Sequence, residues 1–132
     1  MAGSTPCDAE TKKGRLSKAT QFLEAAEVVA AMAEAERDVL DACVTLLVHA
    51  GIAASDAICC EYSGQHPKGQ KHRDAIELLA SIDRRLAGDL GALLAMKTQA
   101  GYSATIVSGT KHTRAVRAAT HLVESATRGV AV

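Results

Sequence analysis

The chain has 132 residues, which fits one domain, and its 15 basic and 15 acidic side chains balance to a formal net charge of zero. This balance excludes a global attraction to nucleic acid, so any such binding would need a local basic patch. One Phe, two Tyr and no Trp leave little ring surface for stacking bases, which counts against a single-stranded RNA binder. Hydrophobic residues make up 48% of the chain, which is ample for a core. Because aromatic residues are so few, this core must be aliphatic.

The N-terminal segment, residues 1 to about 16, is polar and is interrupted by Gly3, Pro6 and Gly14. We therefore expect a disordered tail here, followed by a single helical-bundle domain over residues 17–128. Ser17 is a candidate N-cap for a first helix that ends near Ala35.

The cysteines form no CxxC pair, and the two adjacent ones cannot easily bridge to each other. The N-terminus has no apolar core that would act as a signal or anchor. We therefore expect a cytoplasmic protein in which the cysteines are reduced thiols. They are Cys7, Cys43, Cys59 and Cys60.

The longest apolar segment, residues 38–60, predicts one long central helix. Its apolar residues recur at spacings of four and three, and a flanking stripe widens the apolar surface, so we expect neighbours on several sides. Gly51 costs about 1 kcal/mol of helix propensity relative to Ala, and we expect a close helix crossing to compensate. Asp41 and Asp56 bracket an uncharged run that is shorter than the roughly 20 apolar residues of a membrane span, so we expect no membrane insertion.

A third, more polar stripe of the same helix carries Thr45, His49, Asp56 and Cys59. His49 and Asp56 are two turns apart, roughly 10 Å along the axis, so they cannot touch directly. Two interpretations stay open. The stripe is either a His/Asp site, or a set of polar groups that bond to neighbouring helices or form a partly wet edge.

The remaining chain predicts three further helices. A loop over residues 61–71 is followed by a helix that begins near His72. Asp83 is a candidate cap for the fourth helix, and Ser108 or Thr110 for the last one. No strand-like alternation appears. The sequence therefore predicts an all-α fold, a five-helix up-and-down bundle.

Arg114 and His121 form the first candidate site. They are seven residues apart on the last predicted helix, which puts them on one face. An Arg beside a His can position a phosphodiester and supply an acid or base at neutral pH. The alternative is that both belong to the solvated face that the last helix of a bundle needs.

The predicted loop before the third helix is the second candidate. Gly69 and the start of the third helix offer free backbone N–H groups to an anion. The segment is a phosphate or nucleotide site, or else an exposed charged loop. It is not a P-loop, because it lacks the GxxxxGK[ST] pattern. Its basic residues are His66, Lys68, Lys71, His72 and Arg73.

Metal binding is the third candidate. Cys59, Cys60, His66 and His72 supply nitrogen and sulfur ligands within a short span. Their spacings match no standard zinc pattern, so we predict no metal and no cofactor.

The order of the segments HAGIAASDAICC, GQHPKGQKHRDAIELL and LLAMKTQAGYSA resembles the HEPN-like proteins, in particular small actinobacterial ones, over about residues 20–127. The resemblance implies a helical bundle that is commonly dimeric and often tied to toxin–antitoxin or other stress modules. It also implies that active members are metal-independent RNases. These carry an Arg followed after four to six residues by a His, with a polar residue usually just after the Arg, at the dimer cleft.

The chain departs from that pattern at the expected place. The region from Lys97 to Tyr102 has Lys in place of Arg and no His, and Ala115 follows Arg114. We therefore expect a non-catalytic binding or regulatory homodimer, with a protein partner encoded by a neighbouring gene. One alternative is a HEPN-type endoribonuclease toxin that uses Arg114 and His121. Another is a nucleotide- or phosphate-binding module that uses the basic loop together with Lys97 and Tyr102.

Overall fold

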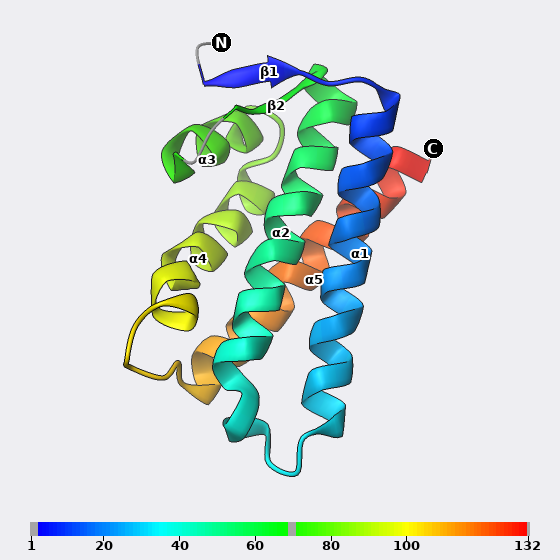
Figure 1. The fold of residues 1–132 in the computed structure, drawn as a ribbon. Helices are drawn as coiled ribbons and strands as arrows, with labels where there is room; N and C mark the ends of the chain where they lie inside the picture. The colour runs from blue at the N-terminus through cyan, green and yellow to red at the C-terminus, as the bar shows by residue number, and fades with distance from the viewer. Residues whose placement is uncertain (1–2, 69–70, 132) are drawn as a thin grey trace.

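The computed structural model describes residues 3–68 and 71–131. Within these residues the elements are, in chain order, β1 (Ser4–Pro6), α1 (Ala9–Met32), a 3-10 turn (Glu36–Val39), α2 (Leu40–Ser63), β2 (Gln65–Pro67), α3 (His72–Ala80), α4 (Arg84–Gly101) and α5 (Gly109–Ala131). The direction of the chain alternates between α1, α2, α4 and α5, and the short α3 lies near one end (Figure 1). The predicted all-α bundle of five helices is confirmed.

The central helix α2 packs against α1, α4 and α5 because small side chains let its neighbours approach closely. A Cβ atom on Gly51 would overlap Leu93 of α4 and would lie 3.3 Å from Leu122 Cδ1 of α5. The close crossing predicted at Gly51 is therefore confirmed. By length and composition the segment Glu36–Ser63 is apolar enough to cross a membrane. However, 72% of its most apolar window is buried inside the bundle, as in the core helix of a soluble protein.

Local chemistry fixes several helix ends. Asp83 Oδ1 accepts hydrogen bonds from the backbone N–H groups of Arg85 and Leu86, at 2.9 and 3.0 Å, which confirms the predicted cap of α4. For α5 the cap is Ser108, whose hydroxyl accepts from the N–H of Lys111. The helix α2 ends at Gly64, whose φ of +71° lies in the left-handed region that favours glycine.

The prediction of a disordered tail is wrong for the residues described. The helix α1 begins at Ala9 and is capped by Asp8, whose carboxylate accepts from the N–H of Thr11 at 2.8 Å, so Ser17 is not its cap. Two ion pairs fasten its first turns to α2: Lys12 Nζ to Glu61 at 2.7 Å and Arg15 Nε to Asp56 at 2.9 Å. These long-range contacts order a segment that is polar by composition.

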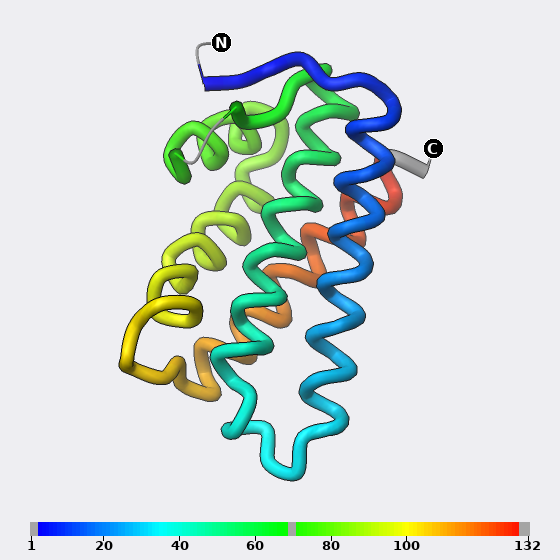
Figure 2. The backbone as a smooth tube through the Cα atoms, in the orientation of Figure 1, coloured from blue at the N-terminus to red at the C-terminus, as the bar shows by residue number. Residues whose placement is uncertain are grey.

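The segment before α1 also forms a strand, which the sequence pattern did not predict. β1 pairs antiparallel with β2, with Thr5 opposite His66. Figure 2 shows this segment crossing the end of the bundle beside β2 before the chain turns into α1. Strands of three residues are too short to show an alternating pattern.

A disulfide bond joins Cys7 to Cys60 across 53 residues, with a Cα–Cα distance of 5.8 Å. The expectation of reduced thiols is therefore wrong for these two residues. Cys43 and Cys59 are free and buried. Spacing along the chain gave no sign of this pair, because the partners meet only once α1 and β1 have packed on α2.

Candidate functional site

Two residues of the polar stripe of α2, His49 and Asp56, line a cavity of about 260 Å³. The cavity is bounded by α2, by the segment from β2 into α3, and by α4. Four of its lining residues are basic, one is acidic, and the others are apolar. The basic ones are His49, Lys71, His72 and Lys97, the acid is Asp56, and the apolar ones are Ile52, Pro67, Ala75 and Leu94.

The fold brings together basic residues that are distant in the sequence. Lys71 is the N-cap residue of α3 and His72 is its first residue, while Lys97 lies in the last two turns of α4. All three were candidates from the sequence, and here they line one cavity. His49, which the sequence left open as part of a polar stripe, lines it from α2.

Asp56 is the acidic group of this cavity, and its side chain is only 13% exposed. Burial raises the pKa of this carboxyl group, and the Arg15 guanidinium and His66 offset part of that rise. Arg15 Nε lies 2.9 Å from Asp56 Oδ2. The carboxylate is therefore already partnered from the side of α1.

His49 lies beside an aromatic ring and lines the same cavity as Lys97. Its ring centroid is 5.7 Å from that of Phe22 on α1. Desolvation lowers the pKa of His49, and the positive charges of Lys97 and Arg15 lower it further, although the residue stays exposed to solvent. At neutral pH the imidazole is therefore neutral, and an anion bound beside it would favour its protonation.

A smaller cavity of about 130 Å³ adjoins the first and shares His49 and Lys97 with it. Its other lining residues include Thr45 and Tyr102, so the sequence candidates Lys97 and Tyr102 also lie together. The side chain of Tyr102 is 82% exposed. Lys97 therefore stands between two adjoining hollows along the same face of α2.

The other basic candidates of the loop do not line the cavity. His66 Nδ1 lies 3.0 Å from the carbonyl oxygen of Pro67. The backbone N–H of Lys68 donates to the carbonyl of Gly3, and Arg73 is exposed and pairs with Glu77 at 3.4 Å. Gly69, whose N–H was a candidate anion ligand, lies outside the described residues.

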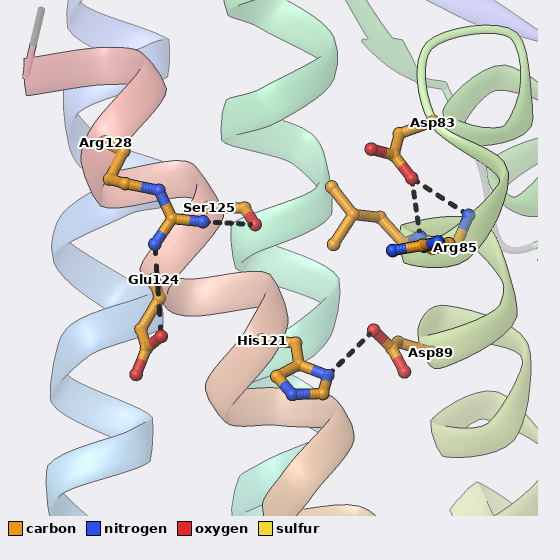
Figure 3. Close-up of polar contacts among 8 residues, drawn as sticks. Asp83, Arg85, Asp89, His121, Glu124, Ser125 and Arg128 are labelled. Carbon is orange, nitrogen blue, oxygen red and sulfur yellow. Dashed lines mark hydrogen bonds and ion pairs between the residues drawn. The ribbon is translucent and has the colours of Figure 1, made fainter.

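Arg114 and His121, the first candidate pair from the sequence, both lie on α5, which packs against α4. A shallow groove of about 440 Å³ there is lined by Arg85, Arg114 and Arg117, together with Asp89. His121 Nδ1 lies 3.4 Å from Asp89 Oδ2, and the two side chains face each other across the helices (Figure 3). The fold thus places Arg114 in a basic groove that is open to solvent, whereas His121 lies outside its lining and pairs with Asp89.

Another cavity, of about 610 Å³, lies where the end of α2 meets α4 and α5, but its charged groups are already partnered. Asp83 caps α4, and Glu61 pairs with Lys12. Arg128 lies 4.0 Å from Glu124 and donates to Ser125 at 3.4 Å (Figure 3). No set of charges converges there on a ligand.

The candidate zinc ligands do not form a site. Cys60 is held in the disulfide bond, and Cys59 is fully buried. Among the residues that the structure describes, no group of three or more His, Cys, Asp or Glu side chains could hold a metal ion.

No protein-family model matches the chain, and no curated protein matches its sequence. The resemblance to HEPN-like proteins therefore stays a prediction. The chemistry of the two basic sites is what bears on function.

Proposed function

We propose that this chain is a non-catalytic binding protein that takes a small phosphate-bearing molecule in the cavity between α2, α3 and α4. One observation carries the proposal: Lys71, Lys97 and His49, from three separate elements, line a single cavity. A dianionic phosphate between two ammonium groups would gain charge-assisted hydrogen bonds from both. The site corresponds to the phosphate-binding alternative that the sequence left open.

The charge balance of the cavity favours an anion. Asp56 would repel one, but its charge is offset by Arg15 at 2.9 Å. Lys71 and Lys97 have no carboxylate partner within ion-pair distance among the described residues. Among the described residues no side chain caps the start of α3, whereas Asp8 and Asp83 cap α1 and α4. The first N–H groups of α3 are therefore available to the same anion.

The apolar part of the lining limits the ligand. Ile52, Ala75 and Leu94 give the cavity a hydrophobic side. Its volume of about 260 Å³ is at the small end of ligand sites, which fits a phosphate monoester with a compact body rather than a dinucleotide.

The same lining supports binding rather than group transfer. The cavity of about 260 Å³ is lined by no Ser, Thr or Cys side chain that would act as a nucleophile. Its carboxylate, Asp56, already accepts a hydrogen bond from Arg15. This carboxylate is therefore engaged by the Arg15 guanidinium.

The assembly predicted from the resemblance to HEPN-like proteins and the location predicted from the N-terminal segment and the cysteines stay predictions. They are a homodimer, a partner from a neighbouring gene within a toxin–antitoxin or stress module, and a cytoplasmic location. The exposed side chains of Tyr102 and Ile106, at 82% and 65%, offer apolar surface for such an interface. Sedimentation at micromolar concentration tests the dimer, and a monomer would contradict it.

Calorimetric titration with phenyl phosphate and a nucleoside monophosphate tests the binding proposal. Lys97→Gln should weaken binding about tenfold or more, because a hydrogen bond to a charged group is worth about 1.5–3 kcal/mol. Arg73→Gln is the matched control, because Arg73 lies beside the site in sequence but outside the cavity. Absence of heat at millimolar ligand, or an equal loss in both variants, would refute the proposal.

A second candidate function is favoured by one specific observation. His121 Nδ1 lies 3.4 Å from Asp89 Oδ2, and Asp89 lines a groove that also carries Arg85, Arg114 and Arg117. The carboxylate can orient the imidazole as a general base, and the arginines can neutralise a phosphodiester, as an endoribonuclease requires.

Incubation with total bacterial RNA tests this second function. Cleavage by the wild type that is lost in His121→Ala would support it. If the wild type and His121→Ala leave RNA equally intact, the endoribonuclease candidate is removed, and the binding proposal is unaffected.

A further inference from the structure

The strand β2, whose last residue lines the proposed binding cavity, has little support of its own. Pro67, at the end of β2, lines the cavity, as do Lys71 and His72 a few residues later. β2 is only three residues long and pairs with a single strand, β1. Two-stranded sheets of this size are marginal in water unless something else anchors them.

Hydrogen bonds join β1 to the cavity wall at several points. The N–H of Cys7 donates to the carbonyl of Gly64 at 3.0 Å, and the N–H of Lys68 donates to the carbonyl of Gly3 at 2.8 Å. The hydroxyl of Ser4 donates to Gln65 Oε1. Movement of β1 would therefore free both ends of the segment that carries Pro67.

The Cys7–Cys60 bond is the covalent anchor of β1. It ties the end of β1 to the last turn of α2, directly before the chain enters β2. The ion pairs of Lys12 and Arg15 hold α1 on α2 without it. Loss of the disulfide bond would thus leave β1 held by its hydrogen bonds, while the ion pairs keep the helical bundle in place.

We propose that the Cys7–Cys60 bond is a redox latch, and that its reduction by a dithiol loosens the β2 wall and weakens ligand binding in the cavity. The proposal rests on the proposed function for its effect on binding, but not for the movement of the wall. It assigns a regulatory role to a segment that the sequence predicted to be a disordered tail.

The chemistry of the latch is ordinary thiol–disulfide exchange. One thiolate of the dithiol attacks the sulfur of Cys7, the sulfur–sulfur bond breaks, and Cys60 leaves as a thiolate that takes up a proton. The second thiol of the reagent then displaces Cys7, so that the dithiol becomes a disulfide and the protein gains two electrons and two protons. Cys7 is the more exposed of the two residues, because it is half-buried and Cys60 is buried.

The neighbouring thiol does not compete in this exchange. Desolvation and the negative charge of Asp56 raise the pKa of Cys59 to about 12, and its side chain is fully buried. The thiolate, which is the attacking species, is therefore nearly absent at neutral pH. The bond responds to an external dithiol and not to an internal rearrangement.

The test compares the oxidised full-length protein with the same protein after treatment with dithiothreitol. Hydrogen exchange at the N–H of Lys68 reports directly on β1–β2 pairing. Calorimetry with phenyl phosphate reports on the cavity, where we expect about a tenfold loss of affinity if the loosened wall is competent about a tenth of the time. Cys7→Ser should behave as the reduced form in any buffer. Cys43→Ala, which alters a buried free cysteine, should keep the full response.

Each outcome decides a separate claim. Unchanged exchange at Lys68 after reduction overturns the latch, whatever the ligand does. Faster exchange with unchanged affinity overturns its effect on binding. If the oxidised protein binds no phenyl phosphate, the proposed function fails, and exchange at Lys68 alone then decides whether the latch exists.

Discussion

Replacement of Gly51 by Ala should destabilise the bundle, although Ala is the better helix former. The exchange alone favours the helix by about 1 kcal/mol. The added methyl group would overlap Leu93 and lie 3.3 Å from Leu122 Cδ1, and both leucines are fully buried. Overpacking of this kind costs about 1–3 kcal/mol. We therefore expect a net loss of about 1 kcal/mol in the free energy of unfolding.

Gly88→Ala is the matched control. Gly88 also lies inside a helix, α4, but no atom lies within 4 Å of the position its Cβ would take. This variant should gain about 0.5–1 kcal/mol, since nothing opposes the gain in helix propensity. Urea unfolding followed by far-ultraviolet circular dichroism measures both. If Gly51→Ala is as stable as Gly88→Ala, the close crossing does not constrain the fold as we argue.

A double-mutant cycle locates the cause. Leu93→Val alone should cost about 1 kcal/mol by removing a buried methylene group. In the Gly51→Ala background it also makes room for the new methyl group, so its cost should shrink or vanish. Strict additivity of the two changes would mean that Leu93 is not what the methyl group meets.

Three further outcomes follow from the polar contacts. Asp83→Ala should lower the free energy of unfolding by about 1 kcal/mol through loss of the α4 cap, measured by urea unfolding. Burial raises the pKa of Asp56 above 3.8, so this carboxylate binds a proton at a higher pH in the folded protein than in the unfolded chain. At neutral pH the ionised carboxylate therefore lowers the free energy of unfolding. That cost disappears as the pH falls toward 3.8, and Asp56→Asn should flatten this part of the stability profile. The pKa of His49 lies below its usual value of 6.5, so the ring gains a positive charge as the pH falls below 6.5. Sulfate, whose own charge is constant, should then bind more tightly in calorimetry. The variant His49→Gln should remove this gain in affinity.

The parts of the fold that sequence reasoning predicted depend on local pattern. Apolar spacing indicated the central helix, and a lone Gly in it indicated a close crossing, which Leu93 and Leu122 provide. Asp83 was recognisable as a cap because capping acts over three residues. Each of these signals lies within one element, so no partner had to be known.

The N-terminal segment escaped prediction because its order comes from partners far along the chain. Lys12 pairs with a residue 49 positions later, and Cys7 with one 53 positions later. Polar composition describes the segment correctly but says nothing about such partners. By composition alone, a polar segment that ion pairs and a disulfide bond hold in place cannot be distinguished from a disordered tail.

The candidate site was predictable only in pieces. Lys71 and His72 were singled out as neighbours in a basic loop, and Lys97 through the comparison with the HEPN-like pattern. Their meeting in one cavity depends on how α3 and α4 pack, which no spacing encodes. For His49 and Asp56 the sequence left two interpretations open; in the structure Asp56 bonds to Arg15 of the neighbouring helix α1, and both residues line the cavity.

The segment that composition assigned to a tail also sets the charge of the proposed site. Asp56 alone would make the cavity unfavourable for an anion, because its carboxylate is partly buried and lines the same space as Lys71 and Lys97. Arg15 offsets that charge from α1, a helix that contributes no residue to the cavity lining. The first turns of α1 therefore act on the ligand through the field they impose on Asp56, and a binding site of this kind cannot be recognised from its lining residues alone.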